Sequence, residues 1–313
     1  MAKTRVFIDG SAGTTGLRIF DRLSLRNDVE LITLDDEKRK DFNYRKEAIE
    51  SADAAFLCLP DNAAREIADA VENKVVKILD TSTAHRTNPV WAYGFPELSA
   101  EYREKIVKSS RIAVPGCHAS GFCSIVKPLI DYGIIAEDYP IAATSVTGYS
   151  GGGKKMIAEY ESSERSAELD SPRQYGLSQQ HKHLPEMMKV CGLKFEPCFS
   201  PIVADYYSGM TVTVPIVARL MKKRVSAAEL QELYSEHYSG KGGVVSVVPC
   251  GESEFLGANN LSGKDGMEIT VCGNDERILI ASRFDNLGKG ASGAALQCFN
   301  IITGNDETAG LEL

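Results

Sequence analysis

In the first half of the chain, short apolar runs alternate with helical patterns, and this alternation limits the possible folds most strongly. The runs occupy residues 6–8, 29–34, 54–59 and 75–80. Apolar residues at helical spacing follow the first run, at Leu17, Ile19, Phe20, Leu23 and Leu25. Nearly all-apolar strands separated by helices are typical of a parallel sheet that is covered on both faces. We therefore expect an α/β fold in this half.

After about residue 140 the pattern changes. Strand-like segments at residues 141–147, 210–218, 243–248, 268–272 and 277–283 follow one another with fewer helices between them. This pattern indicates an antiparallel or mixed sheet, and hence a second domain of α+β type. A final helical segment at residues 290–302 follows an Asp-Asn-Leu-Gly-Lys-Gly turn.

The bulk composition indicates a globular protein that acts on small molecules. The chain has 313 residues, of which 43% are hydrophobic, and this length allows two domains. The net charge of −8 argues against a nucleic-acid-binding surface. We find neither a secretory signal nor an apolar stretch long enough to span a bilayer, so we expect a cytoplasmic protein without a membrane partner. The eight cysteines include no Cys-x-x-Cys pair, and for the seven other than Cys117 we expect reduced, mostly buried thiols.

The first apolar run leads directly into a glycine-rich turn, and a helical pattern follows. The turn reads Gly10-Ser11-Ala12-Gly13-Thr14-Thr15-Gly16. In a strand–turn–helix unit, such glycines let the backbone approach a pyrophosphate, which binds the free amides of the helix N-terminus. The spacing is Gly-x-x-Gly-x-x-Gly rather than the tighter Gly-x-Gly-x-x-Gly. A glycine turn without a ligand is the alternative, but the strand before it and the helix after it favour dinucleotide binding by these seven residues.

The residues after the second strand leave the choice between NAD and NADP open. Asp35 and Asp36 lie about 20 residues beyond the turn, where an acid would hold the ribose hydroxyls of NAD. Lys38, Arg39 and Lys40 follow at once and could bind the 2′-phosphate of NADP.

Cys117 is the candidate nucleophile. It follows Pro115-Gly116, where a strand should end, and it should start a helix. The positive end of a helix dipole and the free amides there lower a thiol pKa and can hold an oxyanion on a bound carbonyl. The alternative is a small buried cysteine that packs beneath the turn.

A cysteine nucleophile needs a proton acceptor, and the chain has five histidines. We expect His118 to point away from Cys117, because adjacent side chains at a helix start diverge, and His237 to face solvent. His181 and His183 precede a helix start marked by Pro185, and they are the candidates for acid–base catalysis, with His183 preferred. Structural or substrate-binding histidines are the alternative. We expect no metal, because no third ligand has a suitable spacing.

Several further motifs occur together with the glycine turn and Pro-Gly-Cys. They are Asp-Thr-Ser-Thr-Ala-His-Arg at residues 80–86, Tyr-Gly-Phe-Pro-Glu-Leu at 93–98, Gly-Tyr-Ser-Gly-Gly-Gly-Lys-Lys at 148–155, His-Lys-His-Leu-Pro-Glu at 181–186 and Asp-Asn-Leu-Gly-Lys-Gly-Ala-Ser-Gly-Ala-Ala at 285–295. In this order they resemble the semialdehyde dehydrogenase superfamily and, within it, the short type of N-acetyl-gamma-glutamyl-phosphate reductases. The matching motifs run nearly end to end.

The resemblance implies a Rossmann-type dinucleotide-binding domain at residues 1–116 and 285–313, with a catalytic and oligomerisation domain at 117–284. It implies reduction of N-acetyl-L-glutamyl 5-phosphate by NADPH in arginine biosynthesis, through a thioester on Cys117, and a homo-oligomer, either dimer or tetramer. The resemblance thus favours NADP over NAD as the cofactor. It also implies that Arg39, Ser82, Gly151, Gly152, Asn286 and Lys289 help to bind the cofactor, and that Arg86, Tyr149 and Ser150 bind substrate.

One departure and two alternatives accompany this resemblance. Many members have Asn-Pro-Gly-Cys-Tyr, whereas this chain has Val114 and His118 at the two outer positions. A sister enzyme, aspartate-semialdehyde dehydrogenase, shares the fold and the thioester route, but the His-Lys-His-Leu-Pro-Glu motif argues against it. The other alternative is a non-catalytic NADP-binding redox sensor.

Overall fold

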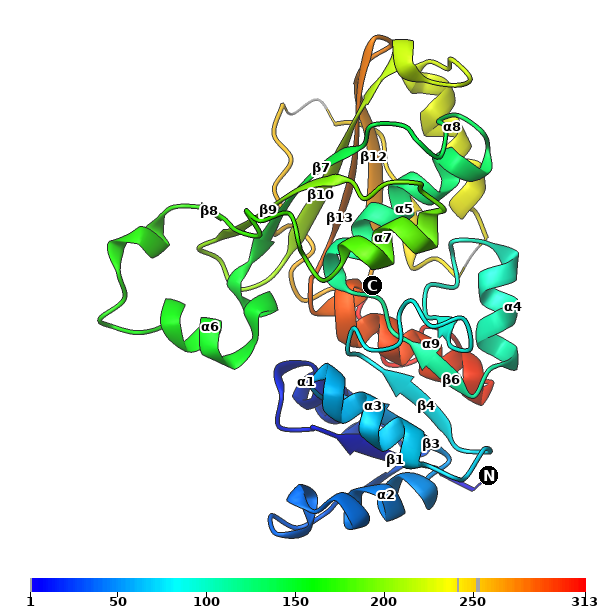
Figure 1. Ribbon diagram of the computed structural model, residues 1–313, viewed down its shortest axis with the longest axis vertical. Helices are drawn as coiled ribbons and strands as arrows, with labels where there is room; N and C mark the ends of the chain where they lie inside the picture. The colour runs from blue at the N-terminus through cyan, green and yellow to red at the C-terminus, as the bar shows by residue number, and fades with distance from the viewer. Residues whose placement is uncertain (1, 241, 252–253) are drawn as a thin grey trace. The chain divides into compact units, whose positions relative to one another are not determined.

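The computed structural model describes residues 2–240, 242–251 and 254–313 and divides the chain into two compact units. The first unit comprises Met1–Gly116 with Ala291–Leu311, and the second comprises Cys117–Gly290 with Glu312–Leu313. Each unit has its own sheet (Figure 1). The expected α/β class, with a parallel sheet in the first half and a mixed sheet in the second, is confirmed.

The first unit contains a six-stranded sheet in the order β2-β1-β3-β4-β6-β5, in which all recorded pairings are parallel. Its strands are β1 (Thr4–Asp9), β2 (Val29–Ile32), β3 (Ala54–Leu57), β4 (Lys77–Asp80), β5 (Ala92–Tyr93) and β6 (Arg111–Ala113). The chain moves from β1 to β2 on one side and then returns to β3 on the other. The strand order therefore reverses at the carboxyl end of β1, where ligands bind in open α/β sheets.

Helices cover both faces of this sheet. They are α1 (Thr14–Ser24), α2 (Phe42–Glu50), α3 (Asp61–Ala70), α4 (Ala100–Lys108) and α9 (Gly293–Thr303). Along β1, Val6 and Ile8 pack with α1, α4 and α9, whereas Phe7 packs with α2 and α3. Because successive strand residues point to opposite faces, one short apolar run supplies both layers of core.

The second unit contains a seven-stranded mixed sheet in the order β11-β12-β13-β10-β7-β9-β8. Its strands are β7 (Ala142–Gly148), β8 (Arg173–Gln174), β9 (Cys198–Ala204), β10 (Met210–Val217), β11 (Val245–Val247), β12 (Met267–Asn274) and β13 (Arg277–Phe284). The pairs β7–β9 and β11–β12 are parallel, and the other pairs are antiparallel. Strands β8 and β9 were not anticipated from the sequence.

The helices of the second unit are α5 (Cys117–Asp131), α6 (Gly153–Tyr160), α7 (Leu184–Cys191) and α8 (Ala227–Tyr238). Helix α5 packs on β10 and β13, α8 packs on β11 and β12, and α7 packs against α5. The expectation that His237 faces solvent is wrong. It is buried on the face of α8 that also carries Leu230 and Tyr234, because positions three and four apart on a helix share one face.

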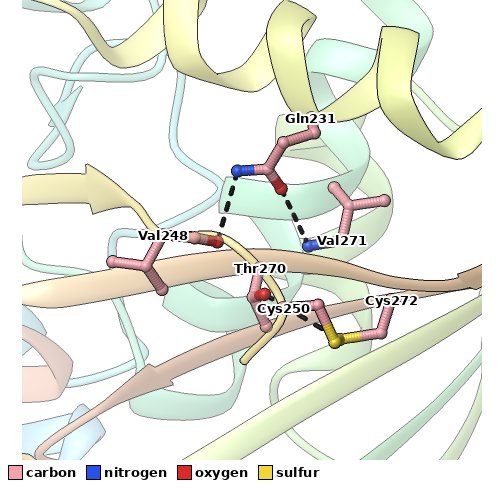
Figure 2. The surroundings of a disulfide bond; sticks show 6 residues. All are labelled: Gln231, Val248, Cys250, Thr270, Val271 and Cys272. Atoms are coloured by element: carbon pink, nitrogen blue, oxygen red, sulfur yellow. Dashed lines mark hydrogen bonds between the residues drawn. A yellow bond between two sulfur atoms is a disulfide. The ribbon is translucent and has the colours of Figure 1, made fainter. Parts of the chain in front are cut away.

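The expectation of reduced, mostly buried thiols is wrong for two of the seven cysteines that it covered. Cys250 and Cys272 form a disulfide that links the segment after β11 to β12, with Cα atoms 5.5 Å apart (Figure 2). Gln231 of α8 supports both sides of this link, because it donates to the carbonyl of Val248 and accepts from the amide of Val271. Within the described segments, no helix is both long and apolar enough to cross a membrane.

Candidate active site

The glycine turn joins β1 to α1 in the first unit, and its backbone leaves no room for side chains at two positions. Gly10 has φ +83°, and a Cβ there would lie 2.3 Å from the carbonyl oxygen of Cys58. A Cβ at Gly16 would lie 2.4 Å from the carbonyl oxygen of Gly10. Gly13 is the N-cap of α1, and no side chain caps this helix end. The turn therefore presents backbone amides at a helix N-terminus, as a phosphate site requires.

A cavity of about 310 Å³ opens beside this turn. Gly10, Ser11 and Ala12 line it together with apolar residues of β1 and β2. Three basic side chains also line it, namely Arg39, Lys40 and Arg45. The Arg45 guanidinium makes a bidentate ion pair with Asp9, with hydrogen bonds of 2.8–3.0 Å, and is thereby held at the end of β1. Asp9 lines the cavity as well and balances the charge of Arg45, so Arg39 and Lys40 supply the positive charge. The cavity thus combines a glycine turn, apolar walls and two basic side chains, a combination that suits a dinucleotide.

Asp35 does not line this cavity, and its carboxylate has local partners. It accepts a hydrogen bond of 3.0 Å from the amide of Lys38 and lies 3.2 Å from the Lys38 ammonium. These contacts lower the pKa of Asp35, with the backbone hydrogen bond as the largest cause. Of the two acids that the sequence offered as ribose ligands, Asp35 therefore stabilises the turn before Arg39. Asp36 does not line the cavity either and lies 3.3 Å from the Arg39 guanidinium.

Ser82 and Arg86 lie in the segment after β4, where their polar groups contact the first unit itself. The hydroxyl of Ser82 donates to Asp80 over 2.8 Å, and Asp80 also lies 2.6 Å from the Nδ1 atom of His85. Arg86 is buried and donates to the carbonyls of Thr81 and Val114 over 2.9 and 2.8 Å. These contacts fix the segment next to the carboxyl ends of β4 and β6.

In the second unit, Cys117 is the first residue of α5, as expected, and its side chain is half-buried. Close backbone packing fixes this helix. A Cβ at Gly121 would lie 2.5 Å from a methyl group of Val212 on β10, and a Cβ at Gly290 would lie 2.9 Å from the Cβ of Cys117. The sulfur is therefore carried by a helix that cannot shift without clashing with the sheet below it.

Three imidazoles gather at the start of α5. The ring of His118 lies 5.3 Å from that of His181 and 5.5 Å from that of His183, and His181 and His183 are 4.8 Å apart. The ring of His118 therefore lies with the two imidazoles that the sequence offered for acid–base catalysis. His183 is buried, and its amide donates to Nδ1 of His181 over 3.2 Å.

Burial keeps two of these imidazoles neutral. The pKa of His118 falls to about 3, because the ring is fully desolvated and the charges of His181 and Lys182 oppose a further positive charge. The pKa of His181 falls to about 4, chiefly through desolvation and then through Lys182. At neutral pH each ring therefore has one N–H donor and one nitrogen acceptor.

Three further side chains join the cluster. The Nδ1 atom of His118 lies 2.7 Å from the hydroxyl of Ser145 on β7, and its Nε2 atom lies 2.6 Å from the hydroxyl of Tyr175 after β8. Phe199 of β9 packs edge-on against His118 at 5.3 Å. Burial raises the pKa of Tyr175, and a negative charge on Cys117 raises it further. No local pattern in the sequence pointed to these three residues, because β7, β8 and β9 bring them together over long separations.

The glycine-rich turn after β7 also lies in the second unit. Tyr149 stacks on Tyr160 with ring centres 4.7 Å apart. Ser150 is buried and accepts a hydrogen bond of 3.0 Å from Asn286, whose side-chain oxygen accepts from the amide of Gly209. Gly151 and Gly152 follow Ser150 in a short 3-10 turn. Asn286 thus ties this turn to the start of β10.

Lys289 lies in a π-helical turn, Gly288–Ser292, and is 1% exposed. Asp285 anchors the chain just before it, accepting from the amides of Leu287 and Gly288 and from the hydroxyl of Ser208. Among the residues that the structure describes, no three His, Cys, Asp or Glu side chains are grouped to hold a metal ion.

Comparison with known proteins agrees with this two-part construction. Residues 5–106 match the semialdehyde dehydrogenase NAD-binding domain, and residues 117–286 match the semialdehyde dehydrogenase dimerisation domain. The chain is 43% identical to N-acetyl-gamma-glutamyl-phosphate reductase 2 of Nostoc sp., over 99% of this chain and 100% of that protein. It is 42% identical to the protein of the same name from Pseudomonas putida, over 96% of each chain.

The chain belongs to the N-acetyl-gamma-glutamyl-phosphate reductases. Within the semialdehyde dehydrogenase family, these reductases carry a nicotinamide dinucleotide-binding domain and a dimerisation domain, and both are present in this chain.

Solved structures show the same fold at low sequence identity. Aspartate semialdehyde dehydrogenase II from Vibrio cholerae, in complex with ASA, superposes with a TM-score of 0.72 at 15% identity, over 97% of this chain and 99% of that one. The enzyme from Candida albicans, with NADP, superposes with a TM-score of 0.69 at 14% identity, over 98% and 100%. The reductase family thus shares its fold with the aspartate enzymes.

Proposed function

We propose that this chain reduces N-acetyl-L-glutamyl 5-phosphate with NADPH, giving N-acetyl-L-glutamate 5-semialdehyde, NADP and phosphate, as a step of arginine biosynthesis. Membership in the reductase family supports the substrate. The observation that carries the chemistry is the cluster of three imidazoles at the helix end that begins with Cys117.

The first unit fits a nicotinamide dinucleotide. Gly10 and Gly16 leave no room for a Cβ, which keeps the backbone amides of the turn open to a pyrophosphate. For the choice of NADP over NAD, we rely on the charges around the cavity. Arg39 and Lys40 line it, whereas Asp35 and Asp36 do not. Asp35 pairs with Lys38, and Asp36 lies 3.3 Å from Arg39. A cationic wall binds a 2′-phosphate and gives no advantage to an unmodified ribose.

The sulfur of Cys117 forms and breaks the covalent bonds to the substrate. Its thiolate attacks the acyl carbon, the bond from that carbon to the phosphate oxygen breaks, and inorganic phosphate leaves a thioester on Cys117. Bound NADPH supplies the hydride that reduces the thioester carbon. Collapse of the tetrahedral hemithioacetal then releases the aldehyde and restores the thiolate.

We propose that His181 exchanges the proton with the reacting oxygen and that His183 supports it. A group that exchanges protons with substrate needs access, and His181 is half-buried whereas His183 is 4% exposed. Nδ1 of His181 accepts from the amide of His183, so the neutral ring carries its proton on Nε2. The sequence alone preferred His183, and the contacts favour His181.

The remaining predicted residues keep their proposed roles. Arg86 is held by two carbonyl groups, which gives its guanidinium the fixed orientation that recognition of a substrate anion needs. Tyr149 and Ser150 are proposed to contact substrate. The other proposed cofactor contacts come from Ser82, Gly151, Gly152, Asn286 and Lys289. We also propose a homo-oligomer, dimer or tetramer, that works in the cytoplasm.

The reverse reaction tests this function. With N-acetylglutamate semialdehyde, phosphate and NADP, the purified chain should produce NADPH, and the Cys117→Ser variant should not. Aspartate semialdehyde is the matched control, because it carries the same aldehyde on a shorter, unacetylated chain. Turnover of the aspartate compound alone would overturn the proposed substrate, and binding of NADP without turnover of either would overturn the proposed reaction.

A further inference from the structure

Arg45 lines the cavity beside the glycine turn, and the cofactor contacts proposed above do not include it. It lies near the start of α2 and reaches Asp9 at the end of β1. The Arg45 side chain is 15% exposed and that of Asp9 is 4% exposed. A nearly buried guanidinium therefore borders the cavity at the point where the strand order of the sheet reverses.

The ion pair with Asp9 uses only one edge of the Arg45 guanidinium. Nε and Nη2 donate to the two carboxylate oxygens over 2.8–3.0 Å. A guanidinium holds five N–H donors in a fixed planar fork. The pair with Asp9 therefore leaves the hydrogens of Nη1 and the outer hydrogen of Nη2, which lie on the edge that points away from the carboxylate.

The Nη1 group on this second edge is accessible to a ligand. Among the residues that the structure describes, none accepts a hydrogen bond from Nη1. Nη1 is also not one of the side-chain nitrogens that are sealed from solvent without a partner. A charged donor edge that borders a cavity and has no protein acceptor fits two oxygens of a bound phosphate.

The charges around the cavity distinguish between the two kinds of phosphate in the cofactor. The lining residues that the structure describes carry more positive than negative charge, with Arg39, Lys40 and Arg45 against Asp9. Asp36, which pairs with Arg39, is 87% exposed and does not line the cavity. This excess suits a phosphate monoester such as the 2′-phosphate of NADP, which carries a charge of about −2. The pyrophosphate has the amides of the glycine turn as its proposed partners.

Arg45 differs from the other two basic residues because its guanidinium is already fixed. The Arg39 side chain is 50% exposed and Lys40 is exposed as well, so both lose rotamer freedom when they bind a ligand. Asp9 holds the plane of the Arg45 guanidinium before any ligand binds. A donor that is fixed in advance loses less entropy on binding and contributes more to affinity.

We propose that Arg45 is a specificity-determining residue for the cofactor: the edge of its guanidinium that points away from Asp9 binds the 2′-phosphate of NADP. This inference rests on the proposed function, which takes NADP as the cofactor. It adds to the charges of Arg39 and Lys40 a contact that recognises the phosphate through its geometry.

The test is calorimetric titration of the purified full chain with NADP and with NAD. Arg45→Lys keeps a positive charge that can pair with Asp9 but loses the second edge, and Arg45→Gln loses the charge as well. We expect the Kd for NADP to rise about tenfold in Arg45→Lys and about 30-fold in Arg45→Gln, because a charge-assisted contact is lost. The Kd for NAD, which has the pyrophosphate but no 2′-phosphate, should stay within about twofold.

Lys46→Gln is the matched control. It also removes one positive charge from α2, but Lys46 pairs with Glu50 and Glu72 and does not line the cavity. Both of its Kd values should match those of the wild type. Arg45→Lys retains an ion pair for the buried carboxylate of Asp9, so the test stands even if Arg45→Gln does not fold.

Three results would overturn the inference. One is an unchanged Kd for NADP in the Arg45 variants, and another is an equal rise of the Kd for NADP and NAD, which would make Arg45 a pyrophosphate ligand or a structural residue. The third is an equal loss of NADP affinity in Lys46→Gln. If the wild-type chain binds NAD as tightly as NADP, the proposed choice of cofactor itself fails.

Discussion

The glycine turn of the first unit and the imidazole cluster of the second arise from the sequence in different ways. The turn is seven consecutive residues, and it works through backbone groups that only glycine leaves accessible. The cluster brings together side chains from α5, β7, β9 and the segments after β8 and before α7. A backbone site can be recognised from local spacing, whereas a side-chain site depends on how distant strands pair.

Replacing Cys117 should have the largest effect, and it should impair the chemistry of the second unit without changing cofactor binding by the first. Cys117→Ser should lower kcat by about 10⁴-fold or more, because a serine hydroxyl is a far weaker nucleophile than a thiolate. Cofactor affinity should stay within about twofold, since the glycine turn belongs to the other unit. Steady-state kinetics and NADP titration measure the two quantities. A parallel loss of NADP binding would show that Cys117 is structural.

Gly10→Ala applies the converse change to the first unit. A Cβ at this position would collide with the carbonyl of Cys58, and φ is positive, so we expect NADP affinity to fall by more than about tenfold. Alkylation of Cys117 should be unchanged. Gly13→Ala is the control, because its Cβ would lie 3.4 Å from its nearest neighbour. If both variants bound NADP like the wild type, the turn would not be the phosphate site.

Arg39→Ala should change cofactor preference rather than cofactor binding in general. Loss of a charge-assisted contact to the 2′-phosphate should raise the KM for NADPH by about tenfold and leave the KM for NADH nearly constant. Lys38→Ala provides the comparison, since Lys38 pairs with Asp35 and does not line the cavity. Equal effects of Arg39→Ala on both cofactors would remove Arg39 from phosphate recognition.

Of these changes, His118→Gln should have the smallest effect, which is on the stability of the folded chain at acidic pH. The pKa of His118 is about 3 in the folded chain and near 6.5 when unfolded. Between these values only the unfolded chain binds the proton, so stability falls as the pH falls, by about 1.4 kcal/mol per pH unit. From pH 7 to pH 5 the wild-type Tm should drop about 4 °C more than that of the variant. Equal drops would mean that His118 is charged in the folded chain.

Much of the fold could be predicted from the sequence because periodicity reports burial directly. The runs that became β1, β3 and β4 are almost wholly apolar, which is the pattern of strands covered on both faces. Strand β8 has two residues and no such pattern, and it was missed. Strand β9 carries a proline at position 201, which argues against a strand when it is read locally.

In the candidate site, too, local features could be predicted from the sequence, and contacts between distant residues could not. Cys117 could be found because a Pro-Gly turn and a helix start are local features. The position of His118 next to Cys117 reveals nothing about its hydrogen-bond partners. These are Ser145 and Tyr175, which are 27 and 57 residues away. The disulfide between Cys250 and Cys272 likewise depends on the placement of the segment after β11 beside β12. No local spacing in the sequence predicts these contacts between distant residues.

Trapping the thioester tests the central claim most directly. The chain is mixed with N-acetylglutamate semialdehyde and NADP in the absence of phosphate, quenched in acid, digested and examined by mass spectrometry. We predict that the peptide containing Cys117 carries an N-acetylglutamyl group and that NADPH forms in equal amount. NADPH formation with the acyl group on a different residue, or with no acylated peptide at all, would contradict the role of Cys117.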